Sequence, residues 1–504
     1  MNYKILYWVD QSLITFGLAK VMQDKGDFEQ FAIFDCTNKP KKFYNEQGII
    51  NFKKIWFYHD FIKKSNQHPN YEYLRKIEND YEIDLWKLAF NERIFNRFNE
   101  YHSFTEDEIL LILEQTCKLF EQLVDEISPD FIVMTLQPNS QQNFLLHSIC
   151  KKRGIKILMV SPTGLKNRYV ITEDPEKLDD FSMEKVEIKK EKSFSEIKEF
   201  HEANNTSDQI ETHHNTYQNS NWMYLKAASS YLFNSSDNTK THYTYYGRTK
   251  FKVTFKLLLY TLRKRLREKF LDKNLSKKID ISRPFIYFPL QMEMERVLLI
   301  GAPFHTNQLE IIKNIIKSMP IGYKLVVKEH PSQMLRGWRK ISDYKEIMNL
   351  PNVKLLHWSV PSKDIIEKCS LVISIKSSSS IEAALRQKPS IIFSNVGFNL
   401  PNSIHKILDI IELPKLIKKL LNSEVDLTDL NRYVNLMEKI SFVFKFHEID
   451  NGFKNYFQKR GYFVDNYILE SKMKECITEY YKELEILANE YIKKIHIHSS
   501  EIKN

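Results

Sequence analysis

Apolar runs and amphipathic segments alternate along the first third of the chain. Three apolar runs have the length of buried strands, at residues 4–9, 131–134 and 155–160. Helices are expected at about 17–23, 105–127 and 144–150. Ser128 and Pro129 end the second helix, and Gly154 caps the third. Strands that alternate with helices predict a parallel sheet.

The same alternation is clearest between residues 285 and 393. Strands are predicted at 285–290, 323–327, 353–356, 371–375 and 390–393. Helices are predicted at 309–316 and 381–386, with a shorter one around residues 365–366. This order is typical of a doubly wound α/β domain of roughly 120 residues.

The chain therefore divides into four regions, and its fold class is α/β with additional helical segments. An N-terminal α/β domain with a polar edge is expected over 1–245, and a basic amphipathic helix over 246–283. The second α/β domain covers 284–412. Residues 413–504 are polar and helical in pattern and form a C-terminal extension.

Composition removes several classes of site. Only 12 of the 504 residues are glycine, and neither the dinucleotide-binding pattern G-x-G-x-x-G nor the P-loop pattern occurs. The five cysteines include no C-x-x-C pair, so no metal site is expected. No signal peptide precedes the first strand, and no apolar stretch approaches the roughly 20 residues that cross a bilayer. We expect a cytoplasmic protein.

The net charge of +10 is local. Residues 248–278 contain twelve lysines and arginines and two acids, 12 − 2 = +10, so the remaining residues sum to zero. Apolar side chains such as Phe251, Leu258 and Leu266 interleave with these cations. A basic amphipathic helix of this kind can lie on an anionic membrane. The alternative is a helix that packs its apolar side on the core, and nucleic-acid binding lacks the aromatic reading surface it would need.

Polar side chains follow two strands of the second domain, where ligands of parallel sheets bind. Ser377, Ser378, Ser379 and Ser380 lead from a strand into a helix, and hydroxyls at a helix N-terminus favour a phosphate. The alternative for any one of these serines is helix capping.

His330 also follows a strand, and Pro331 stiffens its turn. Its imidazole can donate to a phosphate or a leaving group, with Lys328 and Glu329 beside it. The alternative is a histidine satisfied by backbone. Glu382, one turn into the helix after the serines, is placed to accept from a ribose diol or to interact with the helix dipole. The loop from Gln291 to Glu295 is a candidate for the same cleft or an ordinary solvated loop.

These motifs, taken in order, resemble those of the capsular polysaccharide biosynthesis family, which includes Kdo-transferase-like glycosyltransferases of GT-B architecture. The matching elements, over residues 287–398, are Pro289-Leu290-Gln291 with Glu295, Asn307-Gln308, Lys328-Glu329-His330-Pro331, Asn352-Val353, Ser377–Ala383 and Lys388-Pro389. Two departures stand out. Met294 occupies the position of a usual proline, and serines at 377 and 380 occupy those of usual glycines.

The resemblance implies two Rossmann-like domains that face each other across a cleft, with the nucleotide sugar on the second and a glycan or lipid-linked acceptor on the first. His330 would be catalytic, and the donor would contact Gln291, Glu295, Gln308, Lys328, Glu329, Ser377–Ser380 and Glu382. No cofactor and no metal is implied. A histidine–proline motif with a serine motif is also similar to bacterial sialyltransferases, which favours a CMP-linked 2-keto acid sugar.

A transferase must also accept a proton from the acceptor hydroxyl. Asp10, which ends the first strand, fits that position, although a loop acid or helix cap explains it equally well. Two other functions stay open. A sugar-nucleotide 2-epimerase shares the architecture, but its Ser-Gly-Gly-x-x-Glu-Glu loop is incomplete here, since Ala383 follows Glu382. A non-catalytic glycan-assembly protein is the second alternative.

Overall fold

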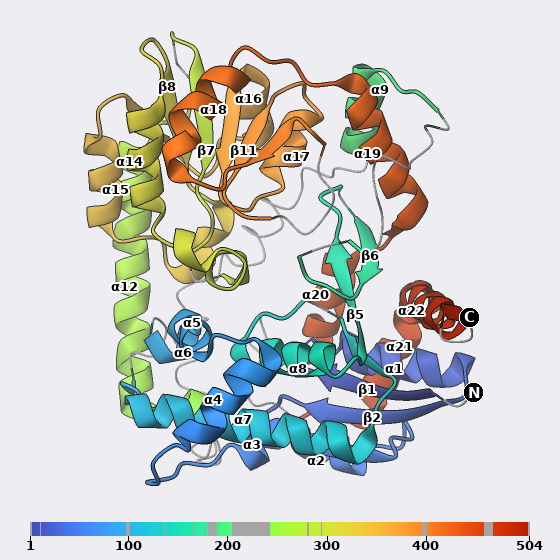
Figure 1. The fold of residues 1–504 in the computed structure, drawn as a ribbon. Helices are drawn as coiled ribbons and strands as arrows, with labels where there is room; N and C mark the ends of the chain where they lie inside the picture. Colours follow the sequence, from blue (N-terminus) through green and yellow to red (C-terminus); the bar gives the residue numbers. More distant parts are fainter. Residues whose placement is uncertain are drawn as a thin grey trace.

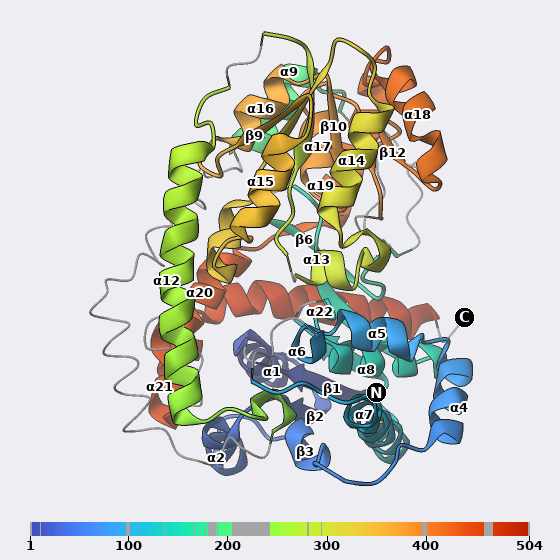
Figure 2. The same ribbon diagram turned by 90° about the vertical axis from the view of Figure 1, so that its left-hand side faces the viewer.

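Two α/β domains are stacked one above the other, and one long helix runs along the side of both (Figures 1 and 2). The computed structural model describes residues 3–10, 12–96, 101–135, 137–165, 167–176, 178–179, 188, 190–203, 242–279, 282–293, 295–395, 401–457 and 467–501. Most of the polar edge segment expected before residue 245 lies outside these residues, as does Met294.

The first domain is built on a seven-stranded sheet with the order β13-β6-β5-β4-β1-β2-β3. Its parallel strands are β1 (Tyr3–Val9), β2 (Phe28–Phe34), β3 (Lys54–Phe57), β4 (Phe131–Met134) and β5 (Lys156–Pro162). Two antiparallel strands complete one edge, β6 (Arg168–Thr172) and β13 (Phe442–Val443). Alternate residues of β1 enter different cores, because successive side chains of a strand point to opposite faces.

Helices cover both faces of this sheet. They are α1 (Ile14–Lys25), α2 (Asn38–Glu46), α3 (Tyr58–Phe61), α4 (Tyr71–Tyr81), α5 (Leu85–Asn91), α6 (Arg93–Asn96), α7 (Glu106–Ile127) and α8 (Gln141–Lys152). The sequence signals at helix ends are confirmed. Thr105 and Glu108 form a reciprocal capping box before α7, and Gly154 follows α8 with a positive φ of 72°.

The second domain has a six-stranded parallel sheet with the order β12-β11-β10-β7-β8-β9. The strands are β7 (Phe285–Pro289), β8 (Lys324–Lys328), β9 (Val353–Leu356), β10 (Leu371–Ser374), β11 (Ser390–Ile392) and β12 (Ile404–Lys406). The helical segments between them are α13 (Arg296–Leu299), η4 (Pro303–His305), α14 (Gln308–Ser318), η5 (Pro331–Arg336), α15 (Ile341–Asn349), α16 (Ser362–Lys368) and α17 (Ser379–Ala384). The α/β class with two Rossmann-like domains is thereby confirmed.

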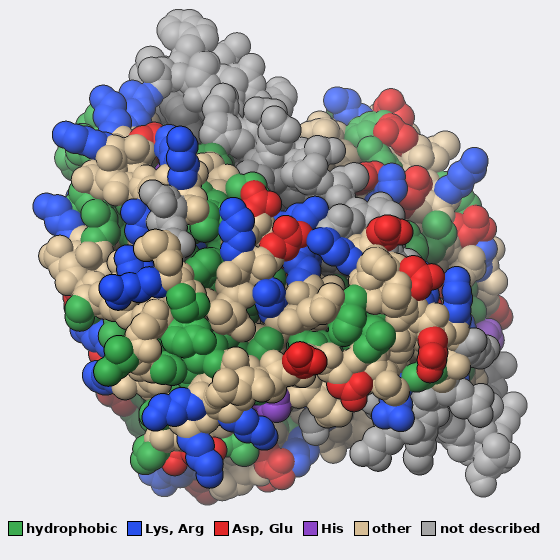
Figure 3. All heavy atoms as spheres, turned by 90° about the horizontal axis from the view of Figure 1, so that it is seen from above, with side chains coloured by type: hydrophobic (Ala, Val, Ile, Leu, Met, Phe, Trp, Pro, Cys, Tyr) green, Lys and Arg blue, Asp and Glu red, His purple; other side chains and the backbone are tan. Residues whose placement is uncertain are grey.

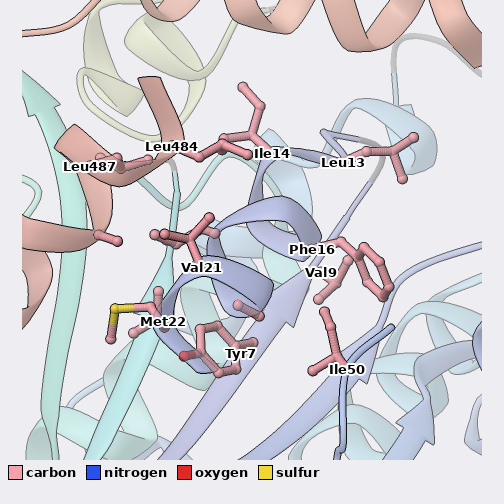
Figure 4. Close-up of a cluster of buried hydrophobic side chains, with 14 of the residues drawn as sticks. Tyr7, Val9, Leu13, Ile14, Phe16, Val21, Met22, Ile50, Leu484 and Leu487 are labelled. Carbon is pink, nitrogen blue, oxygen red and sulfur yellow. The ribbon is translucent and has the colours of Figure 1, made fainter. Parts of the chain in front are cut away.

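The C-terminal region is shared between both domains. Its first helices, η6 (Ile410–Glu412), α18 (Leu413–Leu420) and α19 (Leu427–Ile440), lie with the second domain, and α18 packs on α14. The chain then returns to the first domain through β13, α20 (Phe446–Phe457), α21 (Glu470–Glu479) and α22 (Tyr481–Glu501). Figure 4 shows Leu484 and Leu487 of α22 against the apolar side chains of α1. Gly17 permits this contact, because a Cβ there would lie 2.9 Å from Leu484 Cδ1.

Three further segments connect or flank the domains: α9 (Phe194–Ala203), η3 (Tyr243–Tyr245) and α12 (Lys250–Asn274). The basic segment is helical as expected, but it buries very little. Of the residues in α12, only Leu271 is buried.

Candidate functional site

The strand order of the second sheet reverses at β7: the chain continues to β8 and β9 on one side of β7 and to β10, β11 and β12 on the other. The loops after β7 and β10 therefore diverge and leave room for a ligand. Gln291 follows β7, His330 follows the adjacent β8, and Lys376 and Ser377 follow β10. Three of the predicted segments therefore meet at the carboxyl edge of one sheet.

Gln291 is held in place by Gln308. The Gln291 backbone N–H donates to Gln308 Oε1 at 2.7 Å, and Gln308 Nε2 donates back to the Gln291 carbonyl at 2.9 Å. Both side chains are buried. Gln308 was expected to bind the donor, but its amide is used by the loop, so it positions Gln291 instead. The Gln291 side-chain Oε1 and Nε2 have no partner in the described part of the chain. A buried amide in that state is a ready ligand group.

Glu329 is bound by the protein's own side chains and backbone, and its expected role in donor binding stays a prediction. Its side chain is fully buried and accepts from Arg339 Nε at 2.8 Å, from the Tyr344 hydroxyl at 2.6 Å and from the His330 backbone N–H at 2.6 Å. Arg339 also bonds to Glu293 and donates to the Gln291 carbonyl. This buried ion pair fixes the two loops that carry Gln291 and His330.

His330 caps the 3₁₀ helix η5 and remains half-buried. Its Nδ1 accepts from the Ser332 backbone N–H at 3.1 Å. In the neutral imidazole this bond puts the proton on Nε2, the tautomer that can donate to a phosphate oxygen. The contact of His330 with a phosphate stays a prediction, with which this tautomer is compatible.

Lys328 lies on the opposite face of the sheet, near α16 and α17. Its ammonium donates to Ser362 Oγ at 2.8 Å. Burial lowers the pKa of Lys328 to about 8, although the nearby carboxylates of Glu382 and Glu329 act to raise it. Ser378 Oγ donates to Glu382 at 3.2 Å. Lys328, Ser362, Ser378 and Glu382 therefore line one polar region beside the strand ends.

The four serines do not act as a group. Ser380 is fully buried, and its hydroxyl donates to the Ser377 carbonyl at 2.8 Å, so the loop itself uses this hydroxyl. Ser379 is also buried and shares a hydrogen bond with Ser377 at 3.1 Å. The helix α17 has only six residues, so its dipole contributes little. Ser377 and Ser378 are the serines left partly accessible.

Cations gather where this edge meets the first domain. Arg296 donates to the carbonyl of Pro138 in the first domain, and Lys376 pairs with Glu176 at 3.0 Å. Burial raises the pKa of Glu295, although Arg336, Arg93 and Arg296 all act to lower it. Burial lowers the pKa of Arg296 to about 10 and also lowers that of Arg336, with Arg93 adding to the latter effect.

This interdomain cation cluster consists of Arg93, Arg296, Arg336 and Lys376, set against Glu176 and Glu295. Sequence reasoning found Glu295 but none of the cations. They are isolated basic residues without a motif, and Arg93 is brought in from the other domain. The position of Lys376 directly after a strand was the one available signal.

The carboxyl edge of the first sheet carries Asp10 at the end of β1. Burial raises the pKa of Asp10 to about 7, and the charges of Asp35 and Asp450 add to the effect, against a hydrogen bond from the Ser12 backbone N–H. Asp35, at the neighbouring β2, behaves oppositely. Burial acts to raise its pKa, but His59, which bonds to it at 3.0 Å, and Gln142 bring it below the ordinary value. Asp10 is thus suited to take up a proton near neutral pH.

No cluster of three or more histidine, cysteine or acidic side chains has the geometry of a metal site in the described part of the chain. None of the helices described combines the length and apolar character needed to span a bilayer.

Comparison with known proteins identifies the region that carries the donor-side motifs. Residues 182–401 match the capsule polysaccharide biosynthesis protein family. This confirms the resemblance drawn from the motifs of the second domain. No curated protein matches the chain.

Solved structures with a related arrangement have low similarity to this chain. A UDP-GlcNAc 2-epimerase of Methanocaldococcus jannaschii is 12% identical with a TM-score of 0.27, covering 87% of this chain and 100% of that one. A beta-Kdo 2,7-transferase of Thermosulfurimonas dismutans is 13% identical with a TM-score of 0.28, covering 70% and 87%. At these scores neither likeness bears on the reaction.

Proposed function

We propose that the protein is a glycosyltransferase of surface or capsular polysaccharide biosynthesis, which uses a nucleotide-activated sugar. The observation that carries the proposal is the interdomain cation cluster at the carboxyl edge of the second sheet. Four cations lie at a half-buried seam where charge is weakly screened; Glu176 and Glu295 lie among them, and Glu92 and Asp174 also interact with Arg93 and Lys376. The phosphate of a nucleotide sugar is an anion that these lysine and arginine side chains can bind. The capsule-family match of residues 182–401 supports the same function.

Each site residue then has a definite role. Lys376, Arg296 and Arg336 bind the donor phosphate, and Glu382 accepts from the ribose diol. As the bond between the sugar and the phosphate oxygen breaks, negative charge develops on the nucleotide. His330 Nε2–H and the cations stabilise that charge. Asp10 receives the proton of the acceptor hydroxyl as the new glycosidic bond forms.

A CMP-linked 2-keto acid sugar is the donor we propose. Its phosphate and its carboxylate bring two negative charges for the lysine and arginine side chains of the cluster. A UDP-sugar brings the same charge in its diphosphate, so charge alone does not choose the base. The choice rests on the pairing of a histidine–proline turn with serines at 377 and 378.

The donor claim is tested by thermal unfolding of the full chain with CMP, UDP and GDP. A nucleotide at about 100 times its Kd should stabilise the protein by about 2.7 kcal/mol. Lys376→Met should remove most of this stabilisation, whereas Lys415→Met, a matched change at an exposed lysine of α18, should leave it unchanged. Lack of stabilisation by all three nucleotides at millimolar concentration would contradict the proposal. Conversion of a UDP-sugar to its 2-epimer without acceptor would instead identify an epimerase.

We further propose that α12 brings the enzyme to an anionic membrane face. Five apolar side chains, spaced four, three, four and four residues apart, form one stripe that is 49–85% exposed: Phe251, Phe255, Leu258, Leu262 and Leu266. Arg263, Arg265 and Lys269 are exposed on the same helix. Figure 3 looks down on the second domain, where basic side chains are instead spread among acidic and apolar ones.

The contact face of α12 is chemically different from the stripe. Arg267 donates to the carbonyls of Gly337 and Trp338 at 3.0 and 2.8 Å, and burial lowers the pKa of Lys264. Both belong to the packed side, so a membrane test should leave them intact. An apolar stripe flanked by cations is suited to bind an anionic lipid surface. Each cation near such a surface contributes on the order of 1 kcal/mol to the binding free energy.

Co-sedimentation with vesicles tests this contact. We expect binding to phosphatidylglycerol vesicles, weaker binding at high salt and little binding to phosphatidylcholine vesicles. Changing Phe251, Leu258 and Leu262 to serine should abolish recovery on anionic vesicles, and changing Arg263, Arg265 and Lys269 to glutamine should reduce it. Equal recovery of all three proteins would mean that α12 is only a connection between domains.

A further inference from the structure

A cavity of about 880 Å³ lies in the first domain at the beginning of α12, apart from the donor-side residues. Its walls come from the segment after β3 and from residues 242–249. Among the lining side chains are Lys63, Lys64, Arg248, His59 and His242. The proposed glycosyl transfer assigns no role to any of them.

The cavity is electrostatically positive. Lys63, Lys64 and Arg248 face one lining carboxylate, Asp60, which pairs with Lys41. Lys63 makes no ion pair within the described residues, and Lys64 has a distant one, with Glu108 at 3.7 Å. The lining also includes Thr249, the N-cap of the 25-residue helix α12, whose dipole adds positive potential.

Two buried imidazoles contribute unused polar atoms to the same cavity. The rings of His59 and His242 stack with centroids 4.2 Å apart and planes 6° apart. The His59 side chain is 7% exposed and His242 is 3% exposed. His59 Nε2 is bonded to Asp35, but Nδ1 of both rings has no partner in the described part of the chain. Because His59 Nε2 bonds to the Asp35 carboxylate, the neutral His59 ring carries its proton on Nε2 and its Nδ1 can only accept. Nδ1 of His242 is therefore the ring nitrogen of the pair that can donate to a ligand oxygen in the neutral form.

We propose that this cavity binds a phosphate group of the acceptor, carried by a sugar or by a lipid headgroup. Three lining cations, a long helix N-terminus and one imidazole able to donate exceed what a single carboxylate would use, whereas a phosphate presents several acceptor oxygens. The inference deepens the proposed function, because it makes the acceptor anionic and seats it on the first domain. The exposed stripe of α12 begins at Phe251, two residues after the cavity's Thr249, which brings a membrane-borne headgroup close to the cavity.

Isothermal titration calorimetry of the full chain with sn-glycerol 3-phosphate tests the site directly, with glucuronate as the carboxylate comparison. We expect saturable binding of the phosphate, and weaker binding of glucuronate. Lys63→Gln and Arg248→Gln should each weaken the phosphate about tenfold. The matched pair Lys415→Gln and Lys482→Gln, at exposed lysines away from the cavity, should have no effect. His242→Phe, which retains an aromatic ring on His59, checks the contribution of the ring nitrogen.

These variants distinguish a lipid phosphate from a sugar phosphate, and they test the cavity separately from the proposed donor site. If the phosphate belongs to a lipid, Arg248→Gln should also reduce recovery on phosphatidylglycerol vesicles, whereas the serine variants of the α12 stripe should keep glycerol phosphate binding. If it belongs to a sugar, vesicle recovery should not depend on Arg248. Nucleotide stabilisation should be the same in all cavity variants, so loss of the donor site is recognised separately. Glycerol phosphate affinity that is absent, or equal in wild type and cavity variants with unchanged circular dichroism, would overturn the inference.

Discussion

Replacing Glu329 by glutamine should destabilise the second domain more than any single surface change. The substitution keeps the shape of the side chain but removes its charge, and it leaves the guanidinium of Arg339, only 4% exposed, without its main partner. Breaking a buried ion pair from one side costs about 3–5 kcal/mol. The Glu293 carboxylate, 2.9 Å from Arg339 Nη1, still neutralises part of the guanidinium charge in this variant. We therefore expect the lower end, about 3 kcal/mol.

Two comparison variants calibrate this value. Tyr344→Phe removes one hydrogen bond to the same carboxylate, for which about 2 kcal/mol is expected. Glu346→Gln makes the same chemical change in a surface pair with Lys313, where both side chains are substantially exposed, and should cost below about 1 kcal/mol. The expected order of destabilisation is Glu329→Gln, then Tyr344→Phe, then Glu346→Gln.

Urea unfolding followed by tryptophan fluorescence is a suitable measurement, because buried Trp338 precedes Arg339 and reports on this region. The two domains can unfold in separate steps, so the transition that nucleotide shifts should be used for the comparison. Equal midpoints for Glu329→Gln and Glu346→Gln would refute the view that this ion pair holds the loops of the site.

Three further predictions concern activity. His330→Ala should lower kcat about 10²–10³-fold with an unchanged unfolding midpoint, since it removes a donor to developing charge; near-normal turnover would make His330 structural. Activity that depends on ionised Asp10 should rise with pH through about 7, and Asp10→Asn should lower the rate about 10²–10⁴-fold and remove that pH dependence. The pKa of Asp10 is higher in the folded state than the ordinary 3.8, so its contribution to stability is present below about pH 4 and is lost as pH rises through 7; urea midpoints of wild type and Asp10→Asn across this range measure it. Lys376→Met should raise the KM for the donor and also lower kcat, because its ammonium both binds the phosphate and stabilises the charge that develops there; unchanged values of both would remove Lys376 from the donor site.

The sequence predicted the second domain well because its strands are short, apolar and separated by clear turns. The range 353–356 is reproduced by β9, and the other four predicted strands of that domain differ from β7, β8, β10 and β11 by at most one residue at either end. The strands β2, β3, β6 and β13 of the first sheet and β12 of the second were missed. β2 includes Gln30, a buried polar residue that interrupts its apolar pattern. β6 lies between β5 and β13 and pairs antiparallel with both, and β13 comes from the C-terminal region of the chain. Such pairing is a tertiary effect that local periodicity does not contain.

The site was predicted less well than the fold, for a related reason. A motif gives the position of a residue on the chain but not the direction of its side chain at the end of a strand. Glu329 and Lys328 are neighbours, yet one turns toward Arg339 and the other toward Ser362 on the opposite face. The interdomain cations have no common sequence signal, because they come from α6, α13, η5 and the loop after β10.

The serines that replace the usual glycines at 377 and 380 fit the loop without backbone strain. Left-handed φ angles in the described residues occur at other non-glycine positions, such as Asn352 and Gln387, and not in the serine run. A side chain at 377 or 380 therefore meets no conformational penalty of the kind that glycine avoids. The Ser380 hydroxyl donates to the Ser377 carbonyl, so the serine at 380 takes part in the hydrogen bonding of the loop itself. Ser377 and Ser378 then determine how closely a phosphate can approach the loop. Ser377→Gly should consequently improve donor affinity if its side chain crowds the phosphate, and weaken it if its hydroxyl donates. Calorimetric titration of the tightest-binding nucleotide into wild type and this variant distinguishes the two, and an unchanged Kd would place the phosphate away from this loop.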